Sequence, residues 1–156
     1  MKAKKKEHRH AESIRRLREA KVKDIMNRKP QTVSPETSID DLLERLRGQI
    51  EDCFPVVNKN RKLLGIVTES DLLHVLHPPA ARATVGSVKE AMKSGASTAG
   101  QIMTKRPVTA TPEMTVSQVL NLMVAHKLRH LPVVEGERLV GLVSLRDIIE
   151  FYRLLK

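Results

Sequence analysis

The chain contains an internal repeat, and this repeat constrains the fold more than any other feature of the sequence. When residues 22–59 are placed over residues 99–136, an offset of 77 without a gap, matching residues recur along the whole segment. After the deletion of one residue in the following turn, the offset becomes 76 and the match continues to Asp71 and Asp147. The matched pairs include Met26 with Met103, Pro30 with Pro107, Thr32 with Thr109, Leu43 with Leu120, Pro55 with Pro132 and Gly65 with Gly141. This pattern predicts two copies of one small structural unit.

Each copy has the same predicted order of elements, β-α-β-β-α. A short extended segment, 32–33 or 108–111, precedes a helix whose start resembles a capping box, Ser38 to Asp41 or Thr115 to Gln118. Apolar residues then recur at helical spacing, as far as Ile50 in the first copy. Two β-branched runs joined by a short polar turn predict a hairpin in each copy, and a last helix follows, over 147–155 in the second.

The repeat also predicts how the chain divides. One unit of this size has too little core to be stable alone, so we expect an α+β fold in which both copies pack about a pseudo-twofold axis. The expected divisions are a basic N-terminal helical arm over 1–21, a first repeat over 22–76, a connector over 77–98 and a second repeat over 99–156. Within the connector, a helical turn or two is expected over 85–92.

The positive charge is concentrated in the arm. Residues 1–23 hold ten Lys or Arg and three Glu, a net charge of +7 in a chain whose total is +10. Helical spacing of Ala11, Ile14, Leu17 and Ala20 predicts a helix that packs on the module itself, on a second chain or on an effector protein. The same charge would attract nucleic acid, so residues 1–21 support an alternative function, a nucleic-acid or protein-interaction adaptor.

Composition excludes several other classes of protein. No apolar run has the length of a bilayer span, so we expect no membrane partner. Cys53 is the only cysteine and no signal peptide is evident, which favours the cytoplasm. The sequence holds no nucleophile elbow, no phosphate-binding loop ending in Gly-Lys-Ser/Thr and no full set of metal ligands. We therefore expect neither an enzyme nor a metal site.

At its best-matched residues the chain resembles the cystathionine-β-synthase (CBS) domain family, in the paired form called a Bateman module. The resemblance rests on Asp24-Ile-Met26 and Gln101-Ile-Met103, on the two Pro-Val-Val strands, and on Gly65-Ile-Val-Thr-Glu-Ser-Asp71 and Gly141-Leu-Val-Ser-Leu-Arg-Asp147. The last pattern is the nucleotide-binding signature of that family. The resemblance implies a regulatory module that binds AMP, ADP, ATP or, less favoured, S-adenosylmethionine between its repeats, without a cofactor and as a homodimer.

The residues of the signature suit such a ligand on chemical grounds. The glycine would let the backbone approach a ligand closely. Thr68 and Ser144 lie where a strand passes into a helix, a place that suits a phosphate. Asp71 and Asp147 could accept hydrogen bonds from both ribose hydroxyls. Next to Thr32 and Thr109, Val33 and Ala110 would flank the base, while backbone groups read its edge.

The same residues have a simpler interpretation, since Thr-x-x-Asp and Ser-x-x-Asp are also ordinary helix-capping patterns. Duplication of the pattern beside a strand glycine favours binding in at least one site.

The two copies are not equivalent, however. Arg129 and His130 precede the second Pro-Val-Val strand, where the family often places phosphate-contacting bases, whereas Asp52 and Cys53 precede the first. Because a carboxylate repels phosphate, we expect asymmetric binding; the alternative for His130 is a half-buried packing role.

Overall fold

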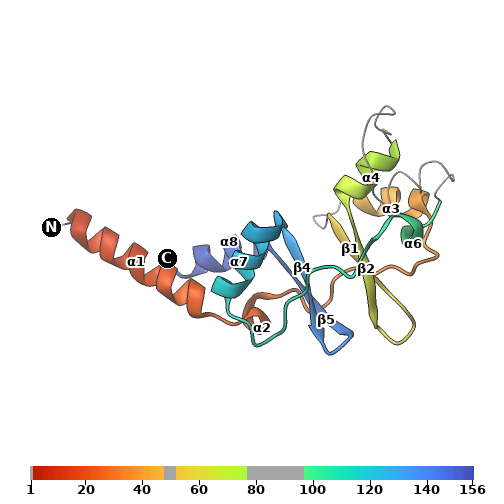
Figure 1. The fold of residues 1–156 in the computed structure, drawn as a ribbon. Helices are drawn as coiled ribbons and strands as arrows, with labels where there is room; N and C mark the ends of the chain where they lie inside the picture. The colour runs from red at the N-terminus through yellow and green to blue at the C-terminus, as the bar shows by residue number, and fades with distance from the viewer. Residues whose placement is uncertain (1, 48–51, 77–96) are drawn as a thin grey trace. The chain divides into compact units, whose positions relative to one another are not determined.

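The computed structural model describes residues 2–47, 52–76 and 97–156, and of residues 2–6 the backbone alone. Helices and short antiparallel sheets alternate in an α+β fold, which confirms the predicted class (Figure 1). Ile50 and the turn expected over 85–92 lie outside the described residues. The elements are α1 (Lys2–Glu19), α2 (Val22–Ile25), α3 (Ile39–Leu46), β1 (Cys53–Val57), β2 (Leu63–Thr68), α4 (Glu69–Leu76), α6 (Ala99–Ile102), β3 (Thr104–Lys105), α7 (Val116–His126), β4 (His130–Glu135), β5 (Arg138–Ser144) and α8 (Leu145–Leu154).

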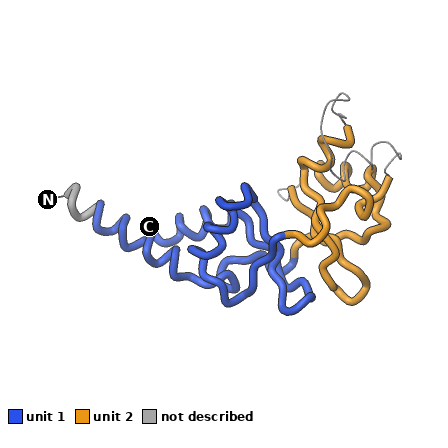
Figure 2. The backbone as a smooth tube through the Cα atoms, in the orientation of Figure 1, with its two compact units in different colours: residues 1–29, 108–156 blue, residues 30–107 orange. Residues whose placement is uncertain are grey.

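Two compact units make up the chain, and each combines parts of both repeats (Figure 2). Unit 1 consists of residues 1–29 and 108–156, and unit 2 of residues 30–107. The first residues of each repeat therefore belong to the unit that the other repeat builds. Sequence alone does not indicate this exchange, because a repeat is defined by similarity and a unit by contact.

Unit 2 is built on a three-stranded antiparallel sheet in the order β1-β2-β3. The pairing of β1 with β2 is the hairpin expected from the sequence, and it places Cys53 opposite Thr68. The extended segment expected at residues 32–33 is reduced to one parallel bridge, between Val33 and Val56. The buried core residues of unit 2 are Val33, Ile39, Leu42, Phe54, Val56, Val67, Leu72, Ala99 and Ile102.

Unit 1 repeats this plan around the hairpin of β4 and β5. His130 lies opposite Ser144 in the hairpin, and Ala110 makes a parallel bridge to Val133. The core of unit 1 is aliphatic apart from two methionines and consists of Val22, Met26, Ala110, Val116, Val119, Met123, Leu131, Val133, Val143 and Ile148. The matched pairing in the two units explains why the sequence repeat extends through both hairpins.

The exchanged segments make equivalent backbone hydrogen bonds in the two units. Each passes beside the first turn of one helix, α7 in unit 1 and α3 in unit 2, and supplies both a donor and an acceptor there. In unit 1 these bonds are Val22 N to Met114 O (2.9 Å) and Val116 N to Ala20 O (2.9 Å); in unit 2 they are Ala99 N to Thr37 O (2.8 Å) and Ile39 N to Ser97 O (2.9 Å). Buried backbone groups need such partners, so each unit is incomplete without the segment it receives.

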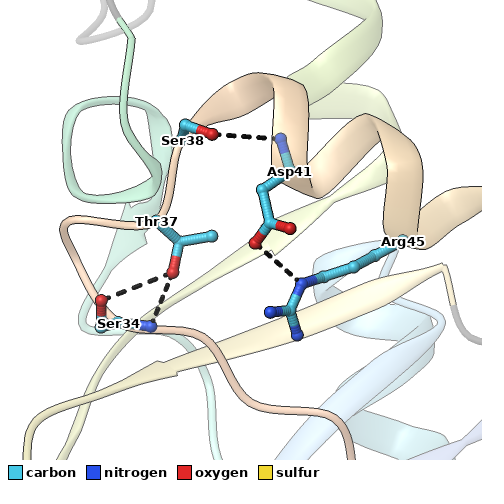
Figure 3. Close-up of polar contacts among 5 residues, drawn as sticks. All are labelled: Ser34, Thr37, Ser38, Asp41 and Arg45. Carbon is cyan, nitrogen blue, oxygen red and sulfur yellow. Dashed lines mark hydrogen bonds and ion pairs between the residues drawn. The ribbon is translucent and has the colours of Figure 1, made fainter.

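Helices α3 and α7 begin at the residues that the capping patterns predict, and of these two helices α7 has the complete capping box. Thr115 accepts from the backbone N–H of Gln118, whose side chain accepts in return from Thr115 N (2.8 Å). At α3, Ser38 accepts from Asp41 N (3.1 Å), but the Asp41 carboxylate turns toward Arg45 Nε (3.0 Å; Figure 3). Asp41 forms an ion pair with Arg45 one turn later in α3, whereas Leu122 stands one turn after Gln118 in α7.

The signature glycines are packed by methionine. A Cβ at Gly65 would lie 2.7 Å from Met103 Sδ and 2.7 Å from the Thr104 carbonyl oxygen, and one at Gly141 would lie 2.7 Å from Met26 Sδ. The space that these glycines leave is thus filled by the exchanged segments. This corrects the interpretation that the glycines are there to let a ligand approach the backbone.

The arm is a helix, as its spacing predicts, and it packs on unit 1 through half of the predicted stripe. Ser13 is 7% exposed and donates from its hydroxyl to the Leu155 carbonyl (3.0 Å), and Leu17 and Ala20 pack on the unit 1 core. Ala11 and Ile14, expected in the apolar stripe, are exposed. The helix is turned so that a serine can satisfy a carbonyl at the end of α8.

No helix in the described part of the chain is both long enough and apolar enough to cross a membrane.

Candidate functional site

In unit 1, three of the residues singled out from the sequence lie at one end of the β4–β5 hairpin. His130 is the first residue of β4 and is opposite Ser144, the last residue of β5. Ser144 caps α8, in which Asp147 lies in the first turn. All three side chains are half-buried. The hairpin and the helix that follows it therefore bring a base, a hydroxyl and a carboxylate together.

Unit 2 places Thr68 and Asp71 in the same way. Thr68 ends β2, and Asp71 lies in the first turn of α4. The residue opposite Thr68 is Cys53, which is fully buried. Unit 2 thus has the hydroxyl and the carboxylate of unit 1 without the imidazole.

Each carboxylate is held by the residue that caps its helix. Asp147 Oδ2 accepts from Ser144 N (2.7 Å) and from Ser144 Oγ (2.7 Å), and Asp71 Oδ2 accepts from Thr68 N (2.7 Å) and Thr68 Oγ1 (2.9 Å). The capping interpretation is therefore observed in both units. Within the described residues, however, Oδ1 of either aspartate accepts no hydrogen bond. Capping and ligand binding do not exclude each other, because the cap holds one oxygen and orients the other.

The two positions expected beside the base are buried. Val33 is 4% exposed and Ala110 is 1% exposed, and both belong to the cores of their units. Their backbones are also engaged: Ala110, for example, donates to Pro132 O (2.9 Å) and accepts from Val134 N (2.9 Å). On one side of these two residues Thr32 and Thr109 are half-buried, and on the other side Ser34 and Thr111 are exposed.

Arg129 and Asp52 occupy equivalent positions with opposite charge. The carbonyl of Arg129 accepts from the first amide of α8, Leu145 N (2.9 Å), and the carbonyl of Asp52 accepts from the first amide of α4, Glu69 N (3.0 Å). These matched bonds fix both residues at the start of the helix that carries the aspartate. Arg129 is exposed and Asp52 is half-buried.

Sequence reasoning missed Met26 and Met103 as structural partners of the signature. The signal was present, since both methionines and both glycines recur in the two copies. Among the described side chains, no group of three or more His, Cys, Asp or Glu could hold a metal ion.

Comparison with known proteins defines the class. The family model of the CBS domain matches residues 22–78 and 99–154. The chain therefore belongs to the CBS domain family, with two copies of the domain in tandem, which confirms the resemblance seen in the signature residues.

Relatives of known sequence include a protein of similar length and a larger enzyme. The uncharacterised protein MJ1426 of Methanocaldococcus jannaschii is 31% identical over 150 residues, covering 83% of this chain and 89% of that protein. An inosine-5′-monophosphate dehydrogenase of Korarchaeum cryptofilum is 31% identical over 144 residues, covering 92% of this chain and 25% of the enzyme. The chain thus spans about a quarter of that enzyme's length.

Solved structures of CBS pairs have the same fold. CBSX2, in a crystal structure with AMP, has a TM-score of 0.73 at 24% identity, over 86% of this chain and 97% of that one. The CBS domain pair of MJ0100, in complex with 5′-methylthioadenosine and S-adenosyl-L-methionine, has a TM-score of 0.68 at 27% identity, over 88% of this chain and 98% of that one.

Proposed function

We propose that this protein is a regulatory module that binds an adenine nucleotide of the AMP, ADP or ATP type and catalyses no reaction. One observation carries the proposal: in each unit a half-buried aspartate is held through one carboxylate oxygen, and the other oxygen accepts no hydrogen bond among the described residues. A ribose offers two hydroxyl donors to such an oxygen. The complexes of CBSX2 and MJ0100 support the adenosyl class of ligand.

The remaining groups have consistent roles in this proposal. Thr32 and Thr109, beside Val33 and Ala110, would contact the base. Thr68 and Ser144 would orient the carboxylates that bind the ribose, and Arg129 and His130 would contact a phosphate. Binding would regulate a partner protein by favouring one of two conformations, which requires a difference in ligand affinity between them.

We also propose that the protein acts in the cytoplasm as a homodimer formed through its last helices. Leu73 and Leu76 on α4 are 62% and 63% exposed, and Ile149, the counterpart of Leu73 on α8, is 53% exposed. Two exposed leucines one turn apart on α4, and an exposed isoleucine at the matching position of α8, favour contact with a second copy.

A pair of matched variants separates binding from capping. Asp147→Ala and Gln118→Ala each remove the side-chain acceptor of a capping box in unit 1, so each should destabilise the fold by about 1 kcal/mol. Calorimetric titration with AMP should show that Asp147→Ala loses most of its affinity while Gln118→Ala keeps it. Equal affinities in the two variants would mean that Asp147 is a helix cap only.

A further inference from the structure

Half of the apolar stripe on α1 is left uncovered by unit 1. The stripe expected from helical spacing consists of Ala11, Ile14, Leu17 and Ala20, and its last two residues pack on the unit 1 core. Ala11 is exposed and Ile14 is 38% exposed. The core of unit 1 therefore explains why Leu17 and Ala20 are apolar, but it does not explain the same property of Ala11 and Ile14.

Ala11 and Ile14 line a groove between α1 and the start of α7. The groove has a volume of about 540 Å³. Its other lining residues are polar or charged, and they are Arg15, Arg18 and Glu19 of α1, Thr115, which is the N-cap of α7, and Ser117 in the first turn of α7. An apolar surface between two helices is a common seat for a helix of a partner protein.

The charge in this groove is net positive. Arg15 pairs with Glu19 on its own helix at 3.7 Å, so that carboxylate is already matched. Arg18 donates to Ser117 Oγ at 3.4 Å, and it forms no ion pair with a carboxylate in the described part of the chain. The positive end of the α7 dipole lies at Thr115 and adds to the charge of Arg18. The groove therefore combines an apolar surface with a cation that lacks an acidic partner among the described residues.

The charge of α1 decides which partner fits the groove. The helix holds eight Lys or Arg and three Glu, a net charge of +5, so the same helix of a second copy would be repelled. Nucleic acid would match the charge, but its phosphate surface would not cover Ile14. An acidic helix with an apolar stripe satisfies both requirements, because its apolar side chains would cover Ile14 while its carboxylates pair with Arg18.

We propose that the groove between α1 and α7 docks an acidic amphipathic helix of another protein. Ala11 and Ile14 contact the apolar side chains of this helix, and Arg18 pairs with its carboxylates. Docking at α1 requires no nucleotide, so this surface goes beyond the proposed function. It supplies a place for the regulated partner, which binding at the aspartates does not locate.

Fluorescence anisotropy of a labelled peptide, titrated with the full chain in the absence of nucleotide, tests this inference. The probe is a synthetic helical peptide with leucine on one face and glutamate at the other positions. We expect it to bind in the micromolar range, and the same peptide with lysine in place of glutamate to bind at least tenfold more weakly. Ile14→Asp and Arg18→Glu should each weaken the glutamate peptide about tenfold or more, as expected for residues at the centre of a contact.

Two matched variants are the controls. Val124→Asp places a carboxylate on an exposed apolar residue of α7 that does not line the groove, and Arg16→Glu reverses an exposed charge on α1 that does not line it. Both should change the affinity less than about twofold at physiological salt, where distant charges are screened. All four altered side chains are exposed, so we expect each variant to fold, and thermal unfolding checks this.

Three results would overturn this docking surface. They are no binding of the glutamate peptide up to millimolar concentration, equal binding of the glutamate and lysine peptides, and equal losses for Ile14→Asp and Val124→Asp. Duplex DNA is titrated in parallel, and if it bound more tightly than the glutamate peptide and Ile14→Asp left its binding unchanged, α1 would be a nucleic-acid surface instead. Nucleotide binding is measured separately, so the proposed function stands or fails independently of the peptide.

Discussion

The signature glycine and the methionine that packs on it form one structural feature at the scale of single residues. Gly65 accepts Met103, and Gly141 accepts Met26, at distances that leave no room for a Cβ. A Cβ at either glycine would also meet a backbone carbonyl oxygen, that of Thr104 at 2.7 Å for Gly65 and that of Asn27 at 2.9 Å for Gly141. The methionine can move but the carbonyl cannot, so neither glycine can be replaced without strain.

We predict that Gly141→Ala destabilises the protein by roughly 1–3 kcal/mol, the usual cost of overpacking a close contact. Met26→Ala alone should also destabilise the protein, because Met26 belongs to the unit 1 core. In the double variant the two losses should sum to less than their separate values, because Met26→Ala removes the sulfur that the new Cβ would meet but not the Asn27 carbonyl oxygen at 2.9 Å. Urea unfolding measures these values. If Gly141→Ala left the stability unchanged and abolished nucleotide binding, the glycine would instead be needed for the ligand to approach the backbone.

Local patterns predicted a large part of the candidate site. Ser144 and Asp147 are three residues apart at a strand–helix junction, so spacing alone places them together. The role of Gly141 could not be predicted in the same way, because its partner Met26 is far away in the sequence. The burial of Val33 and Ala110 was missed for a related reason: each is covered by a core assembled from distant segments.

At the scale of elements, α1 completes the end of α8. Its Ser13 hydroxyl donates to Leu155 O, and Arg9 donates to Lys156 O (2.9 Å). His10 shares a hydrogen bond with the Tyr152 hydroxyl (2.6 Å). The last carbonyls of a helix have no partner within it, so α1 acts as a side-chain cap for α8.

Ser13→Ala should therefore loosen the end of α8. We expect a loss of about 1 kcal/mol for the buried hydrogen bond and faster amide hydrogen exchange in α8, with no change in α4 of unit 2. Glu12→Ala, on the exposed side of α1, is the matched control. Equal exchange in α8 for all three proteins would show that the arm does not stabilise unit 1.

The exchanged segment of unit 1 is also held by an ion pair. Lys23 Nζ on α2 donates to Glu113 Oε1 at 2.7 Å. The hydrogen bond, followed by the charge of the partner, raises the pKa of Lys23 and lowers the pKa of Glu113. Because the pKa of Lys23 is raised in the folded state, Lys23 stabilises the fold at pH values below the ordinary lysine pKa. This stabilisation is lost as the pH rises through the raised pKa. Because the pKa of Glu113 is lowered, Glu113 stabilises the fold at pH values above the ordinary glutamate pKa. This stabilisation is lost as the pH falls through the lowered pKa.

The pair should therefore contribute between about pH 5 and pH 10. Glu113→Gln should lower the thermal midpoint slightly in this range, with no effect near pH 2. Because both side chains are exposed, 1 M salt should remove most of the difference. Glu36→Gln is the control, since Glu36 is the counterpart of Glu113 and Gly100 stands where a lysine would pair with it. An effect of Glu113→Gln that persists at low pH would contradict the assignment.

The elements themselves were largely predictable, but their partners were not. Two β-branched runs joined by a short polar turn predicted the hairpin in each copy, and capping patterns at Ser38 and Thr115 predicted both helix starts. The exchange of residues 22–29 and 99–107 between units depends on contacts across the chain, which no local pattern reports. The arm shows the same limit: helical spacing predicted α1, but not that Ser13 would be buried on it and donate to the Leu155 carbonyl.

At the scale of the whole molecule, the matched apolar surfaces on α4 and α8 predict self-association. Leu73→Asp together with Ile149→Asp should convert a dimer to a monomer, because each places a charge in an apolar contact. Sedimentation velocity measures the result. Val124→Asp, on an apolar residue of α7 that is 78% exposed, should leave the dimer intact. This assembly would be contradicted if the unaltered chain were a monomer, or if the variant with both Leu73→Asp and Ile149→Asp were still a dimer.

The central claim is that the protein binds an adenine nucleotide. Calorimetric titration of the unaltered chain with AMP, ADP, ATP and S-adenosylmethionine tests it most directly. We predict binding of at least one of the three nucleotides in the micromolar range, about −8 kcal/mol. The absence of binding for all four compounds up to millimolar concentration would contradict the claim and would leave Asp71 and Asp147 as helix caps alone.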